Sequence, residues 1–354
     1  MKQSYRVTGL MSGSSMDGVD LACCDFTWDG RNWIYKILVA ETFPYEKELL
    51  SKLEEACNWN RKKIDKLDLE LGIFYSELLN AFHKKEKLSP DFIASHGHTI
   101  LHDPNKGITL QAGNGRIMAE RTGITLINDF RSEDVAQGGQ GAPLVPLGDS
   151  LLFSDYDGCL NLGGFANISC ENSQGKRIAY DLGPANMALN WVAALEGKVF
   201  DLNGEMARRG HVNQELLEKL NQLEFYTMEA PKSLGREWFL DQFLPLIQHS
   251  RLPAVDLMST LVEHISEQIS KGINEAGIKK LLITGGGTLN RALTESIKKN
   301  TKASLIIPEE LLIHYKEALI FALLGVLKIR GETNILSSVT GGKRDISAGT
   351  IYKI

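Results

Sequence analysis

The chain has 354 residues, of which 43% are hydrophobic and 23% are charged, and its formal net charge is −5. This composition is typical of a globular protein with a full core, and the length favours two domains. The acidic balance argues against general nucleic-acid binding, and no stretch approaches the roughly 20 apolar residues of a membrane span. The hydrophilic N-terminus and the five cysteines, which lack metal-ligand spacing, predict a cytoplasmic protein with reduced thiols and no signal peptide.

The first stretch that suggests chemistry is GLMSGSSMDGVD at 9–20, which lies between two apolar runs at 5–10 and 19–26. Turn residues between two such runs predict a β-hairpin. The glycine N–H groups and the serine hydroxyls of its tip can wrap a phosphate, and Asp17 or Asp20 can hold a hydrated Mg²⁺. The alternative is an ordinary polar turn, and the stretch alone does not decide between the two.

A strand at 33–40 and two amphipathic helices follow, and then comes a short buried strand at 91–95 that ends in HGHTILH. Polar groups at the carboxyl end of a strand are where α/β folds place ligands. The three histidines of this segment have a spacing that zinc can use, but no carboxylate or thiolate follows at a supporting distance. We therefore favour contact between this histidine cluster and a sugar hydroxyl, because imidazole can both donate and accept.

A Gly-rich connector, QGGQGAP at 137–143, follows a further strand at 124–127. Runs of glycine interrupt helices and strands and form loops, so this connector is the candidate hinge and domain boundary. A rigid loop that lets the backbone approach a ligand is the alternative.

The second half begins again with three strands, at 158–164, 166–169 and 177–180, in the order that opens the chain. This order predicts a repeat of one fold in both halves. Asp181 follows the third strand and precedes a helix at about 187–196, so an N-cap is its ordinary structural explanation. The remaining elements are helices around 214–223, 238–246, 255–276, 290–299 and 316–330, and strands at 280–283 and 303–307.

The strand at 280–283 runs directly into Gly285, Gly286 and Gly287, and a helix follows. Glycine lets the backbone lie against a nucleotide, and a helix N-terminus adds partial positive charge. The loop has neither the Walker nor the Rossmann spacing. A phosphate-type hairpin in one half and a strand–GGG–helix unit in the other together resemble the actin, heat-shock chaperone and sugar kinase superfamily.

Within that superfamily the chain resembles the anhydro-N-acetylmuramic acid kinases, and the matching motifs run almost from end to end. They are GLMSGSSMDGVD (9–20), SHGHTILHDP (95–104), NDFRSEDVAQGGQGAPLVP (128–146), LNLGGFANIS (160–169), DLGPAN (181–186), PKSLGRE (231–237), ITGGGTLN (283–290), KEALIFALLG (316–325) and SVTGG (338–342).

The resemblance implies an α/β, two-lobed fold in which each lobe is a mixed sheet flanked by helices and ATP lies in the cleft between them. We expect an N-terminal lobe of 1–134 with about 340–354, and a C-terminal lobe of 135–339. The implied enzyme is an ATP-dependent kinase of cell-wall recycling. It opens the 1,6-anhydro ring of anhydro-N-acetylmuramic acid with water and phosphorylates O6.

The resemblance also implies roles for particular residues. Asp181 matches the general base, and Arg131 suits the lactyl carboxylate, which a guanidinium can bind bidentately. The remaining sugar-site positions are His98, Asp129, Asn186 and Glu317. The ATP-binding positions are Gly13, Ser14, Ser15, Met16, Asp17, Gly18, Val19, Asp20, Gly163, Gly164, Gly285, Gly286 and Gly287, with Mg²⁺ held mainly by the phosphates.

The chain departs from the family pattern at His98, Leu182, Ala185 and Asn190, and in the segment 313–316. These departures surround the sugar positions, so another amino sugar or anhydro sugar is the alternative substrate. An ATP-driven chaperone or filament protein is the non-enzyme alternative, but the chain has no separate peptide-binding segment. The expected partner is thus the sugar, with no nucleic acid and no membrane; a homodimer is compatible with the resemblance.

Overall fold

The computed structural model describes residues 2–13, 16 and 18–354, which form two compact units. Unit 1 comprises 1–152 and 315–354, and unit 2 comprises 153–314. The predicted ATP-binding positions Ser14, Ser15 and Asp17 lie outside the described residues. No helix in the described part of the chain is long and apolar enough to cross a bilayer.

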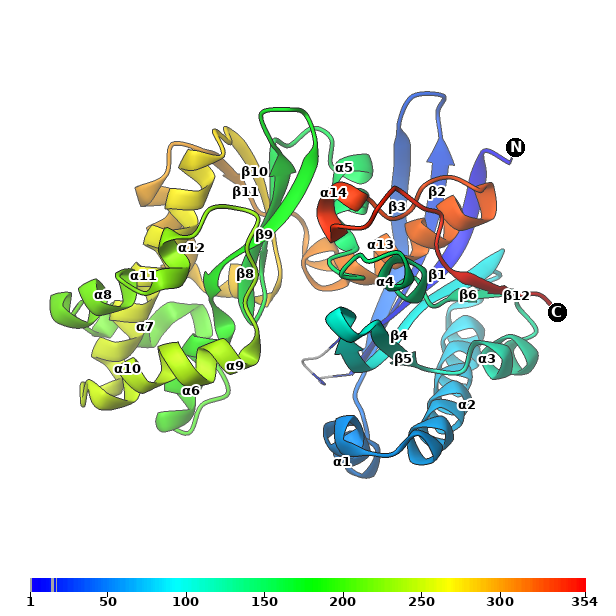
Figure 1. The fold of residues 1–354 in the computed structure, drawn as a ribbon, viewed down its shortest axis with the longest axis horizontal. Coiled ribbons are helices and arrows are strands. Elements are labelled where there is room, and N and C mark those ends of the chain that lie inside the picture. The colour runs from blue at the N-terminus through cyan, green and yellow to red at the C-terminus, as the bar shows by residue number, and fades with distance from the viewer. Residues whose placement is uncertain (1, 14–15, 17) are drawn as a thin grey trace. The chain divides into compact units, whose positions relative to one another are not determined.

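Unit 1 is built on a mixed sheet with the strand order β12-β6-β4-β1-β2-β3, and β5 pairs with the end of β4 (Figure 1). The pairs β1–β2 and β2–β3 are antiparallel, whereas β1–β4 and β4–β6 are parallel. The strands are β1 (Ser4–Ser12), β2 (Val19–Trp28), β3 (Trp33–Phe43), β4 (Phe92–Asp103), β5 (Ile108–Ala112), β6 (Leu126–Asn128) and β12 (Thr350–Tyr352). Its helices are α1 (Lys47–Glu55), α2 (Arg61–Glu86), α3 (Gly115–Thr122), α4 (Ser132–Ala136), α5 (Val145–Leu152) and α14 (Ser337–Thr340), together with α13 (Glu310–Arg330) from residue 315 onward.

The two faces of this sheet follow from the alternation of side chains along its strands. Leu10 and Ile93 point to the core that α2 closes, with Leu67, Leu71 and Leu79 of that helix fully or almost fully buried. The intervening Gly9 points to the other face, where a Cβ would overlap the carbonyl oxygen of Ala318 in α13. Helix α13 therefore packs closely on the sheet because glycine leaves room for its backbone.

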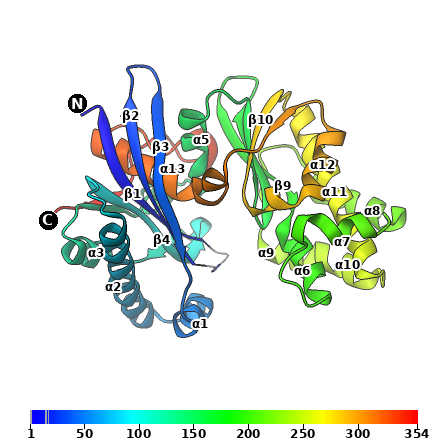
Figure 2. The ribbon, with the colours of Figure 1, turned by 180° about the vertical axis from the view of Figure 1, so that it is seen from behind.

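Unit 2 has a mixed sheet with the order β11-β10-β7-β8-β9 (Figure 2). Its strands are β7 (Gly158–Leu162), β8 (Phe165–Glu171), β9 (Arg177–Pro184), β10 (Lys280–Thr284) and β11 (Ser304–Ile306). The helices are α6 (Asn186–Leu195), α7 (Glu205–Arg209), α8 (Gln214–Asn221), α9 (Arg236–Trp238), α10 (Leu244–His249), α11 (Ala254–Glu275) and α12 (Arg291–Asn300). Helix α11 contributes buried residues such as Leu261, Ile265 and Ile269 to the hydrophobic core of this unit.

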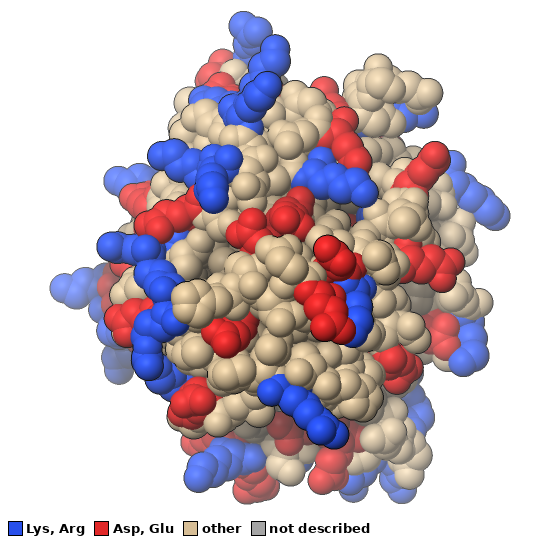
Figure 3. Space-filling view, turned by 90° about the vertical axis from the view of Figure 1, so that its left-hand side faces the viewer, with Lys and Arg blue, Asp and Glu red and all other residues tan. Residues whose placement is uncertain are grey.

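The predicted repeat is confirmed at the level of strand order. An antiparallel meander, β3-β2-β1 or β9-β8-β7, continues in each unit into two parallel strands, β4-β6 or β10-β11. The predicted mixed sheets flanked by helices are confirmed with it. Figure 3 shows acidic and basic side chains interspersed over one face of the molecule, without a broad basic patch in that view.

The structure divides the chain at 152/153 and 314/315 rather than at 134/135 and 339/340. The Gly-rich connector is therefore no hinge between the units. The carboxylate of Asp134, which is fully buried, accepts hydrogen bonds from Gly141 N–H and from the Thr340 hydroxyl, both at 2.8 Å. These bonds tie the connector and the C-terminal segment into unit 1, as the rigid-loop alternative expects.

The strand expected to end before His96 continues to Asp103. The β-branched residues Thr99 and Ile100 favour extended backbone, and β5 supplies the partner strand. Gly97 has a φ of +72°, and a Cβ there would lie 2.5 Å from the carbonyl oxygen of Ala112. The histidine segment is thus an irregular strand with a local glycine kink.

Candidate active site

The described residues at the tip of the β1–β2 hairpin are Gly13, Met16 and Gly18. The Met16 N–H donates to the Gly13 carbonyl at 3.2 Å, and Met16 has a φ of 58°. A Cβ on Gly18 would lie 2.6 Å from the carbonyl oxygen of Phe43, so β3 requires glycine there. The hairpin prediction is confirmed; phosphate binding by its tip stays a prediction.

Behind this tip, a buried network supports the last residue of β1. Ser12 Oγ lies 2.8 Å from His98 Nδ1 and contacts the Tyr45 hydroxyl, which in turn lies 3.0 Å from the Tyr75 hydroxyl. His98 is 1% exposed, and burial lowers the pKa of its imidazole to about 4. His98 therefore supports the hairpin as a neutral ring, and its contact with a sugar stays a prediction.

Arg131 is joined to His96, a partner that the sequence did not indicate. Nε and Nη2 of Arg131 donate to His96 Nε2 at 2.9 and 2.8 Å, and Nη1 donates to the Gly141 carbonyl. His96 Nδ1 lies 2.9 Å from the Gly97 carbonyl, so the hydrogen-bond network assigns the proton to Nδ1. Burial and the neighbouring Arg131 hold the pKa of His96 well below its usual range.

Three of the five guanidinium N–H donors are used in these bonds. Burial lowers the pKa of Arg131 to about 10, while the charge of Glu317 opposes that shift. Arg131 is a guanidinium held rigidly by neutral acceptors, and it remains charged at neutral pH. It suits an anionic group of a substrate better than the surface ion pair that would be its ordinary explanation.

Glu317 follows a bend in α13, where Tyr315 has non-helical backbone angles (φ −113°, ψ 16°). Burial raises the pKa of its carboxyl, and the charges of Lys316 and Arg131 oppose that shift. Its neighbour Lys316 forms an ion pair with Asp149 of α5 at 3.3 Å, with side chains 5% and 4% exposed. The sequence analysis missed this pair, although charged residues inside two apolar runs signal that each needs a partner.

Asp129 and Asp20 have local partners in unit 1. Asp129 has a φ of 57°, and its Oδ1 accepts the Ser132 N–H at 3.2 Å at the start of α4. Asp20 Oδ1 accepts from the Thr42 hydroxyl at 2.6 Å. Among the described residues, no three His, Cys, Asp or Glu side chains gather as a metal site.

In unit 2 the two glycine turns lie together, and Asn186 joins them. Asn186 N–H donates to the Gly163 carbonyl at 3.1 Å, and its side-chain amide donates to the Leu162 carbonyl at 3.0 Å. A Cβ on Gly287 would lie 2.8 Å from Leu162 Cβ and 3.1 Å from Asn186 Oδ1. Asn186 thus lies with the candidate nucleotide loop, whereas the family resemblance assigned it to the sugar.

The GGG loop differs in detail from the predicted strand–loop–helix. Gly286–Leu289 form a 3₁₀ turn, and α12 begins only after Asn290, whose side chain caps it by accepting from Leu293 N–H. Gly285 has a φ of 86°, and a Cβ there would lie 2.5 Å from Asn161 Oδ1 and 2.8 Å from the Leu162 carbonyl oxygen. At Gly286 a Cβ would meet nothing closer than Asn186 Nδ2 at 4.0 Å. The open side of Gly286 is where a nucleotide can approach the backbone.

Gly163 and Gly164 form the β7–β8 turn, and Gly164 accepts hydrogen bonds from Ala185 and Met187 N–H. The start of α6 is therefore fastened to this turn. The open side of Gly286 and this turn share Asn186, so backbone that no side chain covers lies beside the turn. Nucleotide binding at this place stays a prediction.

Asp181 lies within β9, opposite Asn167 of β8, and not at the end of the strand as predicted. The N-cap alternative is wrong, because the N-cap of α6 is Ala185. Asp181 Oδ2 accepts the Leu234 N–H at 2.8 Å. Burial raises the pKa of this carboxyl to about 6, and the Leu234 N–H opposes the shift. A carboxylate with a pKa near neutrality can accept a proton from water.

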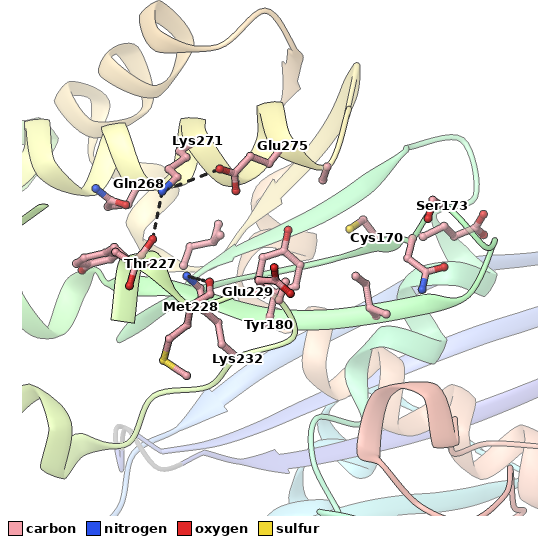
Figure 4. Close-up of a pocket in the computed structure, with 18 residues that line it drawn as sticks. Cys170, Ser173, Tyr180, Thr227, Met228, Glu229, Lys232, Gln268, Lys271 and Glu275 are labelled. Atoms are coloured by element: carbon pink, nitrogen blue, oxygen red, sulfur yellow. Dashed lines mark hydrogen bonds and ion pairs between the residues drawn. The ribbon is translucent and has the colours of Figure 1, made fainter. Parts of the chain in front are cut away.

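A cavity of about 720 Å³ lies on the other side of β9, between that strand, α11 and the segment 226–232 (Figure 4). Tyr180 and Leu182 line it, whereas Asp181 between them does not. Sequence reasoning found neither this cavity nor Lys232 in its wall.

Comparison with known proteins gives consistent matches. The family model "Anhydro-N-acetylmuramic acid kinase" matches residues 5–354. The curated relative of that name from Pasteurella multocida is 35% identical, with 97% of this chain and 96% of the relative covered. The one from Haemophilus influenzae is 34% identical, with 99% and 98% covered.

Among solved structures, a ROK hexokinase from Thermus thermophilus is 15% identical with a TM-score of 0.41, covering 91% of this chain and 99% of its own. The whole-length sequence matches are the ones that assign the family. The chain belongs to the anhydro-N-acetylmuramic acid kinase family.

Proposed function

We propose that the protein is an ATP-dependent kinase that opens the 1,6-anhydro ring of anhydro-N-acetylmuramic acid with water. The products would be N-acetylmuramic acid 6-phosphate and ADP. The observation that carries the proposal is Asp181, a shielded carboxylate with a pKa of about 6 within a chain that matches the family from residue 5 to its end.

In this reaction Asp181 takes the proton of the water that adds to C1, while the bond from C1 to O6 breaks. The released O6 accepts the γ-phosphoryl group of ATP, and ADP leaves. Holding the base rigidly matters because a misplaced group loses much of the benefit of proximity. The pairing of Asp181 with Asn167 across β9–β8 and the bond to Leu234 N–H supply that rigidity.

The other predicted site residues would bind the sugar, the nucleoside and the triphosphate. Arg131 would bind the lactyl carboxylate, and Glu317, Asp129 and His98 would lie at the sugar. Gly285–Gly287 with Gly163, Gly164 and Asn186 would hold the nucleoside, and the hairpin tip from Gly13 to Asp20 would hold the triphosphate. Mg²⁺ would be bound mainly by the phosphates, with Asp20 acting through water.

The test is an ADP-release assay with purified protein, ATP and Mg²⁺, in which the anhydro sugar and free N-acetylmuramic acid are compared side by side. We expect turnover with the anhydro sugar only. In ¹⁸O-labelled water the label should enter at C1 and not the phosphate. Turnover with the free sugar alone, or label in the phosphate, would contradict ring opening by water.

The alternative is a kinase of another amino or anhydro sugar, which the departures at His98, Leu182, Ala185 and Asn190 suggest. In that case ADP release should be faster with a different 1,6-anhydro sugar or a free amino sugar in the same panel.

A further inference from the structure

The segment that follows the loop at 229–231 lies along the open edge of unit 2's sheet, next to Asp181. The Lys232 carbonyl accepts the Asp181 N–H at 2.9 Å, and two residues later the Leu234 N–H donates to Asp181 Oδ2 at 2.8 Å. The backbone and the carboxylate of Asp181 are therefore both held by one short segment. Because β9 is an edge strand, this segment supplies bonds that no neighbouring strand provides.

The side chain of Lys232 holds that segment to the rest of the unit. Its ammonium group donates to the carbonyls of Phe225 at 2.8 Å and Met228 at 3.0 Å, and it lies 4.5 Å from the centre of the Phe225 ring. Figure 4 shows Lys232 reaching into the wall of the 720 Å³ cavity, next to Met228. Both bonds end on backbone atoms, so Lys232 connects two pieces of main chain.

We propose that Lys232 is a positioning residue for Asp181, acting through the Leu234 N–H. The inference rests on the proposed function, because it concerns the base of that reaction. The ammonium group fixes residue 232, whose own carbonyl bonds the Asp181 backbone, and the same short segment then aims the Leu234 N–H at the carboxylate. The Lys232 ammonium bonds Phe225 and Met228, whereas the Asp181 carboxylate bonds the Leu234 N–H.

The pKa of Asp181 is the quantity by which this proposal can be tested. Burial raises the pKa of Asp181, and the hydrogen bond from the Leu234 N–H lowers it. Burial and the ammonium of Lys271 lower the pKa of Lys232, while Glu275 opposes that shift. Loosening the Leu234 N–H should therefore raise the pKa of Asp181 above about 6, since the bond favours the ionised form.

Lys271 offers a matched control. It lines the same cavity and donates to the Tyr226 carbonyl at 3.1 Å, yet it bonds neither residue 232 nor residue 234. A purely structural role of cavity lysines would make Lys232→Met and Lys271→Met behave alike.

The experiment compares kcat/KM against pH for the wild type, Lys232→Met, Lys232→Arg and Lys271→Met. In Lys232→Met we expect the acidic limb to move up by about 0.5–1 pH unit, so that activity falls about two- to fivefold at pH 6 and little at pH 8.5. Lys232→Arg should restore part of the shift, and Lys271→Met should keep the wild-type profile. A loss that is uniform over pH, or an equal shift in Lys271→Met, would overturn the proposal.

A second measurement does not depend on turnover. Carbon-13 NMR of the labelled aspartate carboxyls should show Asp181, identified by its loss in Asp181→Asn, titrating at a higher pH in Lys232→Met than in the wild type. Leu234→Pro, which removes the N–H donor, should give the same direction of shift. An unchanged titration in both variants would contradict the inference. An enzyme that titrates as expected but turns over no sugar would contradict only the proposed function.

Discussion

The two units share a strand order, but the charged groups singled out in each have different kinds of partner. In unit 1, Lys316 pairs with Asp149 at 3.3 Å, and Arg131 donates to His96. In unit 2, the carboxylate of Asp181 has one recorded partner, the Leu234 N–H, and a pKa raised by burial to about 6. In unit 1 the side-chain partners hold charged groups in fixed positions, which suits the binding of a charged ligand. In unit 2 the raised pKa of Asp181 suits the exchange of a proton near neutral pH.

The largest effect that this comparison predicts is on turnover in Asp181→Asn. The amide keeps the shape of the side chain but accepts no proton, so kcat should fall by about 10²–10⁴ while ATP and sugar binding persist. Single-turnover kinetics and calorimetric titration would check this. Near-normal turnover would remove Asp181 from the role of base.

The same variant has a stability consequence with a defined sign. The folded pKa of about 6 lies above the roughly 3.9 of an unfolded aspartate, so the contribution of the protonated form is full below 3.9 and is lost as pH rises through 6. Above pH 6 the ionised group therefore costs stability, and Asp181→Asn should be more stable by about 1–2 kcal/mol at pH 8 but not at pH 4. Calorimetric unfolding with exposed Asp155→Asn as control would show whether the gain is specific.

The second effect concerns the buried ion pair of unit 1. Lys316→Met removes the ammonium partner of the buried Asp149 carboxylate, which should cost about 3–5 kcal/mol of unfolding free energy. The double variant Asp149→Leu/Lys316→Met should recover much of that loss. Removing the exposed pair of Arg61 and Asp65 should cost less than about 1 kcal/mol. Equal losses at the two pairs in denaturant titrations would contradict the contrast.

The third effect is on sugar binding by Arg131. In Arg131→Ala the KM for the sugar should rise about 10–100-fold, with little change for ATP, because the contact is remote from the bonds that react. Steady-state kinetics with each substrate varied in turn measures both constants. A rise in the KM for ATP with the sugar unaffected would place Arg131 elsewhere.

The smallest effect separates two adjacent glycines. Gly287→Ala places a Cβ 2.8 Å from Leu162 Cβ and should destabilise the protein by about 1–2 kcal/mol. Gly286→Ala meets no neighbour within 3.9 Å, so it should fold normally but weaken ATP binding severalfold. Unchanged ATP affinity in Gly286→Ala would mean that the nucleotide does not approach this side of the loop.

Local pattern in the sequence predicted much of the fold correctly. The opening hairpin, helix α2, helix α11 and the strand before the GGG loop all have apolar spacings that neighbouring residues decide among themselves. The errors arose where distant segments decide the outcome. The strand β4 runs on past His96 because β5 pairs with it, and the Gly-rich connector is fixed because Asp134 bonds Gly141 and Thr340.

For the candidate site, the sequence by itself determined which chemical groups are available: Asp181, Arg131, Glu317 and the two glycine turns. Tertiary structure alone decided which partners these groups have and what their pKa values are. Asp149 and Lys316 lie 167 positions apart in the chain, and Leu234 lies 53 positions from Asp181. No local pattern encodes such pairs, and the pKa of a carboxyl depends on the burial and hydrogen bonds that only these long-range contacts create.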